Sequence, residues 1–129
     1  MTEARRVLVI EDEFLTAMEL ATVLEELGHA VCAIVDTEEE AVEAAARQRP
    51  DLITADVRLR SGDGIAAVGR ITAATPVPVV YVTSSDAELR RRAPSSVQVS
   101  KPFDAKSVSR AIAAVLGVPP VAVPPVTRS

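Results

Sequence analysis

Short apolar runs alternate with longer segments of helical periodicity from one end of the chain to the other. Each run consists mainly of branched aliphatic residues and ends in polar or turn-forming residues, which is typical of a buried β-strand. Five segments show this pattern: Val7–Ile10, Ala30–Val35, Leu52–Ala55, Pro78–Thr83 and Val97–Val99. Since their apolar residues are continuous rather than alternating with polar ones, we expect both faces of the sheet to be covered.

Helical segments follow the five runs in turn, at residues 14–27, 37–48, 65–73, 86–92 and 104–116. Thr37 and Glu40 have the spacing of a capping box, and Asp104 is a candidate N-cap for the last segment. The segments at 65–73 and 86–92 carry weaker signals, the second because it is short and highly charged. The first segment is expected to bury the residues that recur at its helical spacing, which are Phe14, Met18, Ala21, Leu24 and Leu27.

The strand-then-helix rhythm, repeated five times, predicts an α/β fold with a parallel sheet and right-handed crossovers. The 129 residues are enough for one domain, which we place at residues 1–116. Residues 117–129 contain four of the nine prolines and are expected to form an extended, loosely held tail rich in Pro and Val.

Composition narrows the classes of function. Fourteen Lys and Arg against eighteen Asp and Glu leave a net charge of −4, which disfavours a non-specific nucleic-acid binder. Aromatic residues make up only 2% of the chain, so base-stacking surfaces are not expected. The N-terminus does not read as a signal peptide and no apolar stretch is long enough for a membrane span, so we expect a cytoplasmic protein without membrane contact. His29, the single histidine, is expected to be a solvated loop residue and not a phosphorylated group.

Polar residues with distinctive chemistry stand at the ends of four of the predicted strands. Glu11, Asp12 and Glu13 follow the first strand, and Asp56 follows the third. Thr83 ends the fourth strand and Lys101 follows the fifth. Because sites in open α/β sheets form beyond the carboxyl ends of the strands, we expect these residues to meet at one rim. Glu13 is expected to be a first-turn helix acid rather than a ligand.

This combination of residues suits phosphoryl transfer. Three carboxylates in one cleft repel each other unless a divalent cation neutralises them, and Mg²⁺ prefers a few carboxylates plus water and phosphate oxygens. A lysine is suited to meet a phosphoryl oxygen as a point charge, and a threonine hydroxyl can donate a hydrogen bond to it. The sequence therefore predicts a carboxylate phosphoacceptor with Mg²⁺, Lys101 and Thr83 around it.

Four segments together resemble the receiver domain of two-component response regulators. They are Val-Leu-Val-Ile-Glu-Asp-Glu at 7–13, Pro-Asp-Leu-Ile-Thr-Ala-Asp at 50–56, Val-Val-Tyr-Val-Thr-Ser at 79–84 and Lys-Pro-Phe at 101–103. The resemblance covers residues 6 to 116 in order and at the usual spacings. It implies a flavodoxin-like, doubly wound fold with five helices and a five-stranded parallel sheet in the order 2-1-3-4-5.

The resemblance also implies a role for individual residues. Asp56 matches the phosphoacceptor, and Glu11 and Asp12 match the Mg²⁺ carboxylates. The backbone carbonyl of Arg58 would supply a third metal contact. Thr83 matches the switching hydroxyl and Lys101 the phosphate-sensing lysine, with a cis peptide expected before Pro102.

Some positions depart from the family pattern. Glu11 stands where most relatives have an aspartate, and Gln98 stands where an aromatic switch residue is usual, three positions before Lys101. Tyr81, two residues before Thr83, is the tyrosine that could take over the aromatic role. The segment 78–83 also resembles a subgroup of stress-response receivers with a Phe-Ala-Thr motif, although Val82 and Ser84 break that motif.

These features predict a stand-alone receiver that is not an enzyme beyond catalysing its own phosphorylation and dephosphorylation. Its phosphodonor would be a sensor histidine kinase or a histidine phosphotransfer protein, and its output would be binding to a downstream protein. Two alternatives stay open at this point. One is a pseudo-receiver that binds its partner without phosphorylation, and the other is a receiver fragment of a longer response regulator.

Overall fold

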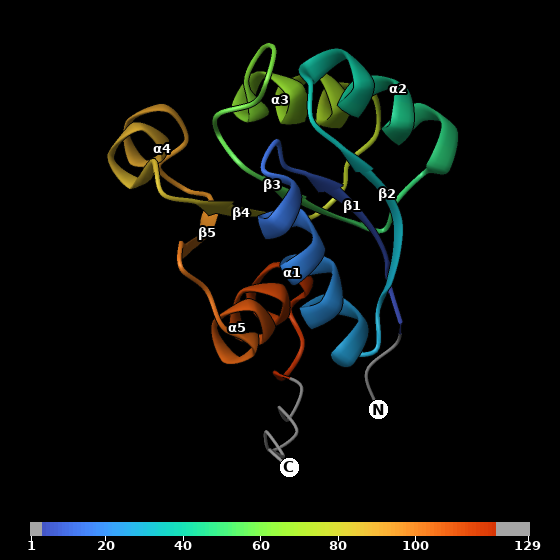
Figure 1. Ribbon diagram of the computed structural model, residues 1–129, viewed down its shortest axis with the longest axis vertical. Helices are drawn as coiled ribbons and strands as arrows, with labels where there is room; N and C mark the ends of the chain where they lie inside the picture. Colours follow the sequence, from blue (N-terminus) through green and yellow to red (C-terminus); the bar gives the residue numbers. More distant parts are fainter. Residues whose placement is uncertain (1–3, 121–129) are drawn as a thin grey trace.

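The computed structural model of the protein describes residues 4–120 (Figure 1). Strands and helices alternate strictly along these residues, as the sequence predicts. The strands are β1 (Arg6–Ile10), β2 (Ala30–Val35), β3 (Leu52–Ala55), β4 (Val79–Thr83) and β5 (Val97–Ser100). The helices are α1 (Phe14–Glu26), α2 (Glu38–Gln48), α3 (Gly64–Ala74), α4 (Asp86–Arg92) and α5 (Ala105–Leu116).

The five strands form one parallel sheet in the order β2-β1-β3-β4-β5, which confirms the flavodoxin-like topology. Because β1 lies between β2 and β3, the chain reverses its direction of winding after β2. The carboxyl ends of β1 and β3 are therefore neighbours, with Ile10 in register with Ala55. Residues that directly follow these two strands are placed side by side at the rim.

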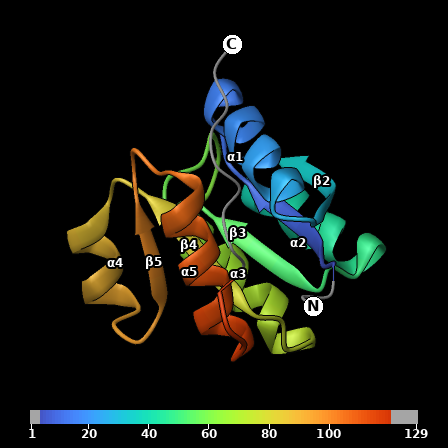
Figure 2. The same cartoon turned by 90° about the horizontal axis from the view of Figure 1, so that it is seen from below.

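Helices cover both faces of the sheet, as the continuous apolar strands predict (Figure 2). Along β1, Val7 and Val9 pack with residues of α1 and α5, whereas Leu8 and Ile10 pack with residues of α2 and α3. This is the two-residue period of a strand whose alternate side chains enter two separate cores. Leu89 of α4 belongs to the same core as Leu8 and Ile10.

The expected buried face of the first helix is only partly right. Phe14 and Met18 are 74% and 45% exposed, and the buried face of α1 consists of Ala17, Leu20, Ala21 and Leu24. Phe14 and Met18 share their spacing with this face, but they lie about one residue step around the helix from it. The prediction that His29 is solvated is also wrong, because the residue is 5% exposed and its Nδ1 accepts the backbone N–H of Arg5 at 3.1 Å.

Side-chain caps fix three of the helix starts. Thr37, Asp63 and Asp104 each accept a backbone N–H three residues onward, from Glu40, Ala66 and Ser107. α5 ends at Gly117, which adopts the left-handed conformation favoured by glycine. The predicted tail at 117–129 lies, from residue 121 on, outside the described residues. Within residues 4–120, no helix combines the length and the apolar character needed to cross a membrane.

Candidate functional site

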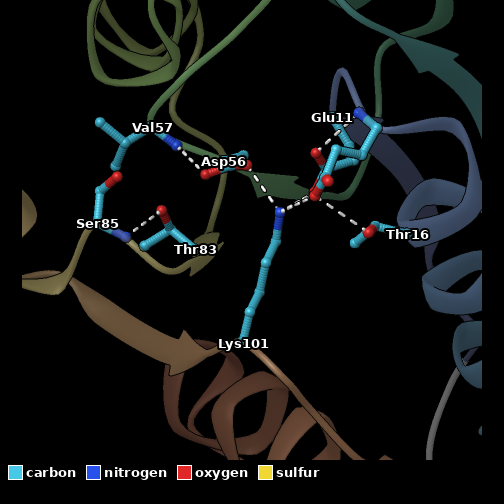
Figure 3. Close-up of polar contacts among 8 residues, drawn as sticks. Glu11, Thr16, Asp56, Val57, Thr83, Ser85 and Lys101 are labelled. Carbon is cyan, nitrogen blue, oxygen red and sulfur yellow. Dashed lines mark hydrogen bonds and ion pairs between the residues drawn. The ribbon is translucent and has the colours of Figure 1, made fainter.

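Residues from four strand ends meet at one rim of the sheet, as predicted (Figure 3). Glu11 and Asp12 directly follow β1, and Asp56 directly follows β3. Thr83 is the last residue of β4, and Lys101 directly follows β5. The parallel topology brings together side chains that are up to 90 positions apart in the chain.

Lys101 is the electrostatic centre of this rim. Its Nζ donates to Asp56 Oδ2 at 2.8 Å and lies 2.7 Å from Glu11 Oε1. Glu13, which the sequence suggested only as a helix acid, also contacts this ammonium at 3.4 Å. Burial by itself would lower the pKa of Lys101, but the hydrogen bonds to Asp56 and Glu11 outweigh burial and raise that pKa. The ammonium is therefore a permanent positive charge among the carboxylates.

Glu11 is the most strongly perturbed carboxyl of the rim. Its side chain is 2% exposed, and burial is the main cause that raises its pKa to about 7. The hydrogen bond from Lys101 and the backbone N–H of Glu13 act in the opposite direction, while the charge of Asp56 raises the pKa further. Lys101 and the Glu13 N–H therefore do not fully offset the cost of burying the ionised Glu11 carboxylate, and a bound cation would stabilise it further.

The two carboxylate oxygens of Asp56 have different partners. Oδ1 accepts the backbone N–H of Val57 at 2.7 Å, and Oδ2 accepts the Lys101 ammonium. The residue is only 7% exposed, so one buried carboxylate is held at a fixed position with a cation beside it. This arrangement can orient the carboxylate as a nucleophile and neutralise charge that develops on an oxygen nearby.

The donor set of the rim fits Mg²⁺. Glu11, Asp12 and Asp56 each present a carboxylate oxygen, and these oxygens lie within 4.8 Å of one another. Asp12 is exposed while the other two are buried, so the cluster opens to solvent on one side. Hard carboxylate oxygens at an open site are what Mg²⁺ prefers, because it keeps several of its waters. Arg58, whose backbone carbonyl the family resemblance adds to these three carboxylates, lies in the loop after Asp56.

Thr83 is fully buried at the end of β4, and its Oγ1 accepts the backbone N–H of Ser85 at 3.0 Å. Tyr81 is 4% exposed and packs in the same core as Leu89, on the α4 side of the sheet. Burial raises the pKa of this phenol to about 12. Side chains two residues apart share one face of a strand, so Thr83 and Tyr81 lie on the same side as predicted.

Gln98 is in register with Tyr81 on the neighbouring strand β5. Its side-chain amide donates to Asp86 at the start of α4, and the hydroxyl of Ser100 donates to the same Asp86 oxygen at 3.2 Å. A polar link between β5 and α4 thus occupies the place where the family resemblance leads one to expect an aromatic side chain.

Gly64, at the start of α3, is a site residue that the pattern of strand ends did not indicate. A Cβ atom at this position would lie 1.7 Å from the backbone oxygen of Asp56, which is impossible without movement. The N–H of Gly64 donates to the carbonyl of Val57 at 2.8 Å, closing the loop over the phosphoacceptor candidate. The Asp-Gly pair at 63–64, eight residues after Asp56, was the available signal.

Comparison with known proteins agrees with this geometry. The sequence model of the response regulator receiver domain family matches residues 7–113. The phyllosphere-induced regulator PhyR of Methylorubrum extorquens is 37% identical over 117 residues, which are 88% of this chain and 44% of PhyR. The transcriptional regulatory protein PdtaR of Mycobacterium tuberculosis is 36% identical over 112 residues, 84% of this chain and 55% of PdtaR. This chain therefore spans about half the length of both relatives.

A solved structure of an isolated receiver domain is also similar to this chain, over nearly the full length of that domain. The receiver domain of PhyR from Erythrobacter litoralis, determined by NMR in solution, superposes with a TM-score of 0.82 at 33% identity. The match covers 88% of this chain and 91% of that domain. The similarity to PhyR also agrees with the stress-response subgroup suggested by residues 78–83. The chain belongs to the response regulator receiver domain family.

Proposed function

We propose that this receiver accepts a phosphoryl group on Asp56 in a Mg²⁺-dependent reaction and signals by phosphorylation-dependent protein binding. The observation that carries the proposal is the buried Asp56 carboxylate, 2.8 Å from the Lys101 ammonium and within one carboxylate cluster with Glu11 and Asp12. The proposed donor is a phosphohistidine of a sensor histidine kinase or a phosphotransfer protein.

In the proposed transfer, an Asp56 carboxylate oxygen attacks phosphorus. A P–O bond forms, the P–N bond to the donor imidazole breaks, and the imidazole nitrogen keeps the electron pair. Mg²⁺, held by Glu11, Asp12 and Asp56 with the Arg58 carbonyl, would neutralise the negative charge of carboxylates and phosphoryl oxygens. Lys101 would exchange its contact with Asp56 Oδ2 for a phosphoryl oxygen, which is a short movement for its flexible side chain.

Thr83 is the proposed sensor of the phosphoryl group. Its oxygen already accepts the N–H of Ser85, so the hydroxyl hydrogen is available to donate to a phosphoryl oxygen. That hydrogen bond would draw the β4 end toward Asp56 and favour a different arrangement of β4, α4 and β5. We propose that Tyr81 and Gln98, which are paired on β4 and β5, change position in response.

An exposed apolar surface lies beside the rim. Phe14 and Leu15 begin α1 directly after the carboxylates and are 74% and 81% exposed. Large apolar side chains exposed next to a reactive centre favour docking of an apolar partner surface. We propose that the donor protein covers these two residues when its phosphohistidine reaches Asp56.

One observation favours a second candidate function, a pseudo-receiver that binds its partner constitutively. Gln98 replaces the expected aromatic residue and is tied to Asp86 of α4, so this surface is held by polar contacts rather than by a movable ring. The proposed function is that of the receiver domain. An output segment in a longer protein would have an activity of its own, which the receiver would regulate.

Incubation with Mg²⁺ and acetyl phosphate tests the proposal directly. We expect intact-mass spectrometry to show one added phosphoryl group that is absent without Mg²⁺ and absent in Asp56→Asn. Beryllofluoride should shift the amide NMR signals of Thr83 and its neighbours in the native protein only. An unmodified Asp56 under these conditions, or an Asp56→Asn variant that binds its partner as well as the native protein, would establish the pseudo-receiver instead.

A further inference from the structure

Helix α4 buries a single apolar side chain against the domain. Among its seven residues, all of them described, Leu89 alone is buried. Both ribbon views show α4 beside β4 and β5 at one end of the sheet, away from α1 and α5 (Figures 1 and 2). With one apolar anchor, the position of the helix depends strongly on its polar contacts.

These polar contacts lead from the last turn of α4 to the loop that follows Asp56. Arg92 Nη2 lies 2.8 Å from Asp63 Oδ2, and Arg92 Nη1 lies 3.0 Å from Glu88 Oε2. The other oxygen of Glu88 is 3.5 Å from Arg58 Nη2. We call this set the clasp: Arg58, Asp63, Glu88 and Arg92.

Three of the four side chains of the clasp are less exposed than those of an isolated surface ion pair. The Asp63, Glu88 and Arg92 side chains are 26–32% exposed, against 64% and 72% for the isolated Arg47–Glu43 pair. The Arg58 side chain is 78% exposed, so its contact with Glu88 is an ordinary surface pair. Arg92 contacts two carboxylates at once, through Nη2 and Nη1, and these two contacts fix the orientation of its guanidinium. Shared, partly buried charges of this kind contribute more than single exposed pairs.

Asp63 is the point at which the clasp reaches the loop. Its Oδ1 caps α3 through the N–H of Ala66 at 2.7 Å, and its backbone forms an isolated antiparallel bridge with Arg58. Asp63 therefore joins three parts of the molecule: its side chain contacts the start of α3 and the end of α4, and its backbone bridges to Arg58 in the 57–63 loop. A displacement of α4 would reach Arg58 mainly through Asp63, whose backbone bridges to it.

We infer that Arg92 is a positioning residue that holds the 57–63 loop in place from α4 and thereby couples the position of α4 to the metal site. The first part stands on the contacts of the clasp. The second rests on the proposed function, because it requires the Arg58 carbonyl to be a Mg²⁺ contact. A partner that draws α4 away would separate Arg92 from Asp63 and weaken Mg²⁺ binding. By thermodynamic reciprocity, Mg²⁺ would weaken binding of that partner by the same factor.

The test compares Arg92→Gln with Arg91→Gln. Arg91 is exposed and has no ion pair among residues 4–120, so its variant makes the same change of net charge without opening the clasp. Asp63→Asn opens the same contact from the other side, and asparagine still caps α3. The readouts are amide NMR shifts of residues 57–63 in Mg²⁺-free protein and the Mg²⁺ dissociation constant from calorimetry.

We expect Arg92→Gln and Asp63→Asn to shift the 57–63 amides similarly, and Arg91→Gln to leave them in place. Mg²⁺ affinity should fall about twofold to fivefold in Arg92→Gln, as expected for loss of such ion pairs. The double variant should lose no more than either single variant.

Loop shifts no larger in Arg92→Gln than in Arg91→Gln would overturn the positioning role. Shifted loops with equal Mg²⁺ affinities would overturn the coupling to the metal. If the native protein binds no Mg²⁺, the proposed function fails, and with it the coupling, while the Mg²⁺-free spectra still decide whether Arg92 holds the loop.

Discussion

The ammonium nitrogen of Lys101 lies 2.8 Å from Asp56 Oδ2, joining two residues 45 positions apart. The same nitrogen lies 2.7 Å from the buried Glu11 carboxylate. In the protein without a metal ion, Lys101 is thus the cation that neutralises the two buried acids. We therefore expect the stability of the domain and its affinity for Mg²⁺ to depend on the same three side chains.

Replacing Lys101 by methionine should destabilise the domain. The change leaves Glu11 and Asp56 buried without their cation, and breaking such a pair costs about 3 kcal/mol. Urea unfolding at neutral pH checks this, with Lys101→Arg as the control that keeps the charge. Because Mg²⁺ can supply the missing positive charge, it should restore more stability to Lys101→Met than to the native protein. Equal stabilisation of both by Mg²⁺ would argue against a metal at this cluster.

The stability of the domain should depend on the protonation of Glu11. Its pKa is about 7 in the folded protein against an ordinary 4.5, so the folded state binds this proton more tightly than the unfolded state. The stabilisation is complete below pH 4.5 and is lost as the pH rises through about 7, a change of about 3 kcal/mol. Unfolding free energies of native protein and Glu11→Gln between these pH values check this. The difference between the two curves removes the opposite contribution of His29, whose pKa burial lowers.

Protonation of Glu11 should also control Mg²⁺ affinity, which should rise with pH where the stability of the domain falls. A proton on Glu11 competes with the cation, so affinity should rise with pH and level off above about 7. Calorimetric titration with Mg²⁺ across this range, in two buffers of different ionisation enthalpy, should also show proton release near neutral pH. Glu11→Gln should bind Mg²⁺ more weakly and without this pH dependence. A pH dependence that persists in Glu11→Gln would assign the proton to another group.

Two glycines of α3 should respond in opposite ways to replacement by alanine. A Cβ at Gly64 would meet the Asp56 carbonyl oxygen at 1.7 Å, whereas a Cβ at Gly69 would meet nothing within 4 Å. Gly64→Ala should therefore cost about 2 kcal/mol or more and shift the Asp56 amide signal. Gly69→Ala should stabilise the exposed helix position by about 0.5–1 kcal/mol. Urea denaturation and NMR spectra of the two variants provide the measurement.

Replacing the exposed apolar residues at the start of α1 should slow phosphorylation by protein phosphodonors but not by small-molecule donors. Phe14→Ser with Leu15→Ser removes apolar surface beside the rim but no group that contacts Asp56. Phosphotransfer from a cognate kinase should slow about tenfold or more, as for loss of a docking contact. Labelling by acetyl phosphate should keep its rate. Val118→Ser, two residues after the end of α5, is the control for exposed apolar surface. Slower labelling by acetyl phosphate as well would mean that the double variant disturbs the site itself.

The sequence by itself determined the topology and the composition of the rim. Branched aliphatic runs that end in Glu11, Asp56 and Lys101 predict parallel strands, and the carboxyl ends of parallel strands share one edge. Resemblance to receivers supplied the strand order, which the sheet confirms. These predictions succeed because they depend on local periodicity and on a connection rule that holds for nearly all such folds.

Only the tertiary structure decided which side chains of these elements meet. Phe14 has the spacing of the buried face of α1 yet lies exposed, because the rotation of a helix about its axis is set by what it packs against. The approach of Gly64 to the Asp56 carbonyl and the contact of Arg92 with Asp63 join positions that no sequence period relates. Such contacts depend on how loops and helices dock on the finished sheet, and so the spacing of residues in the chain does not determine them.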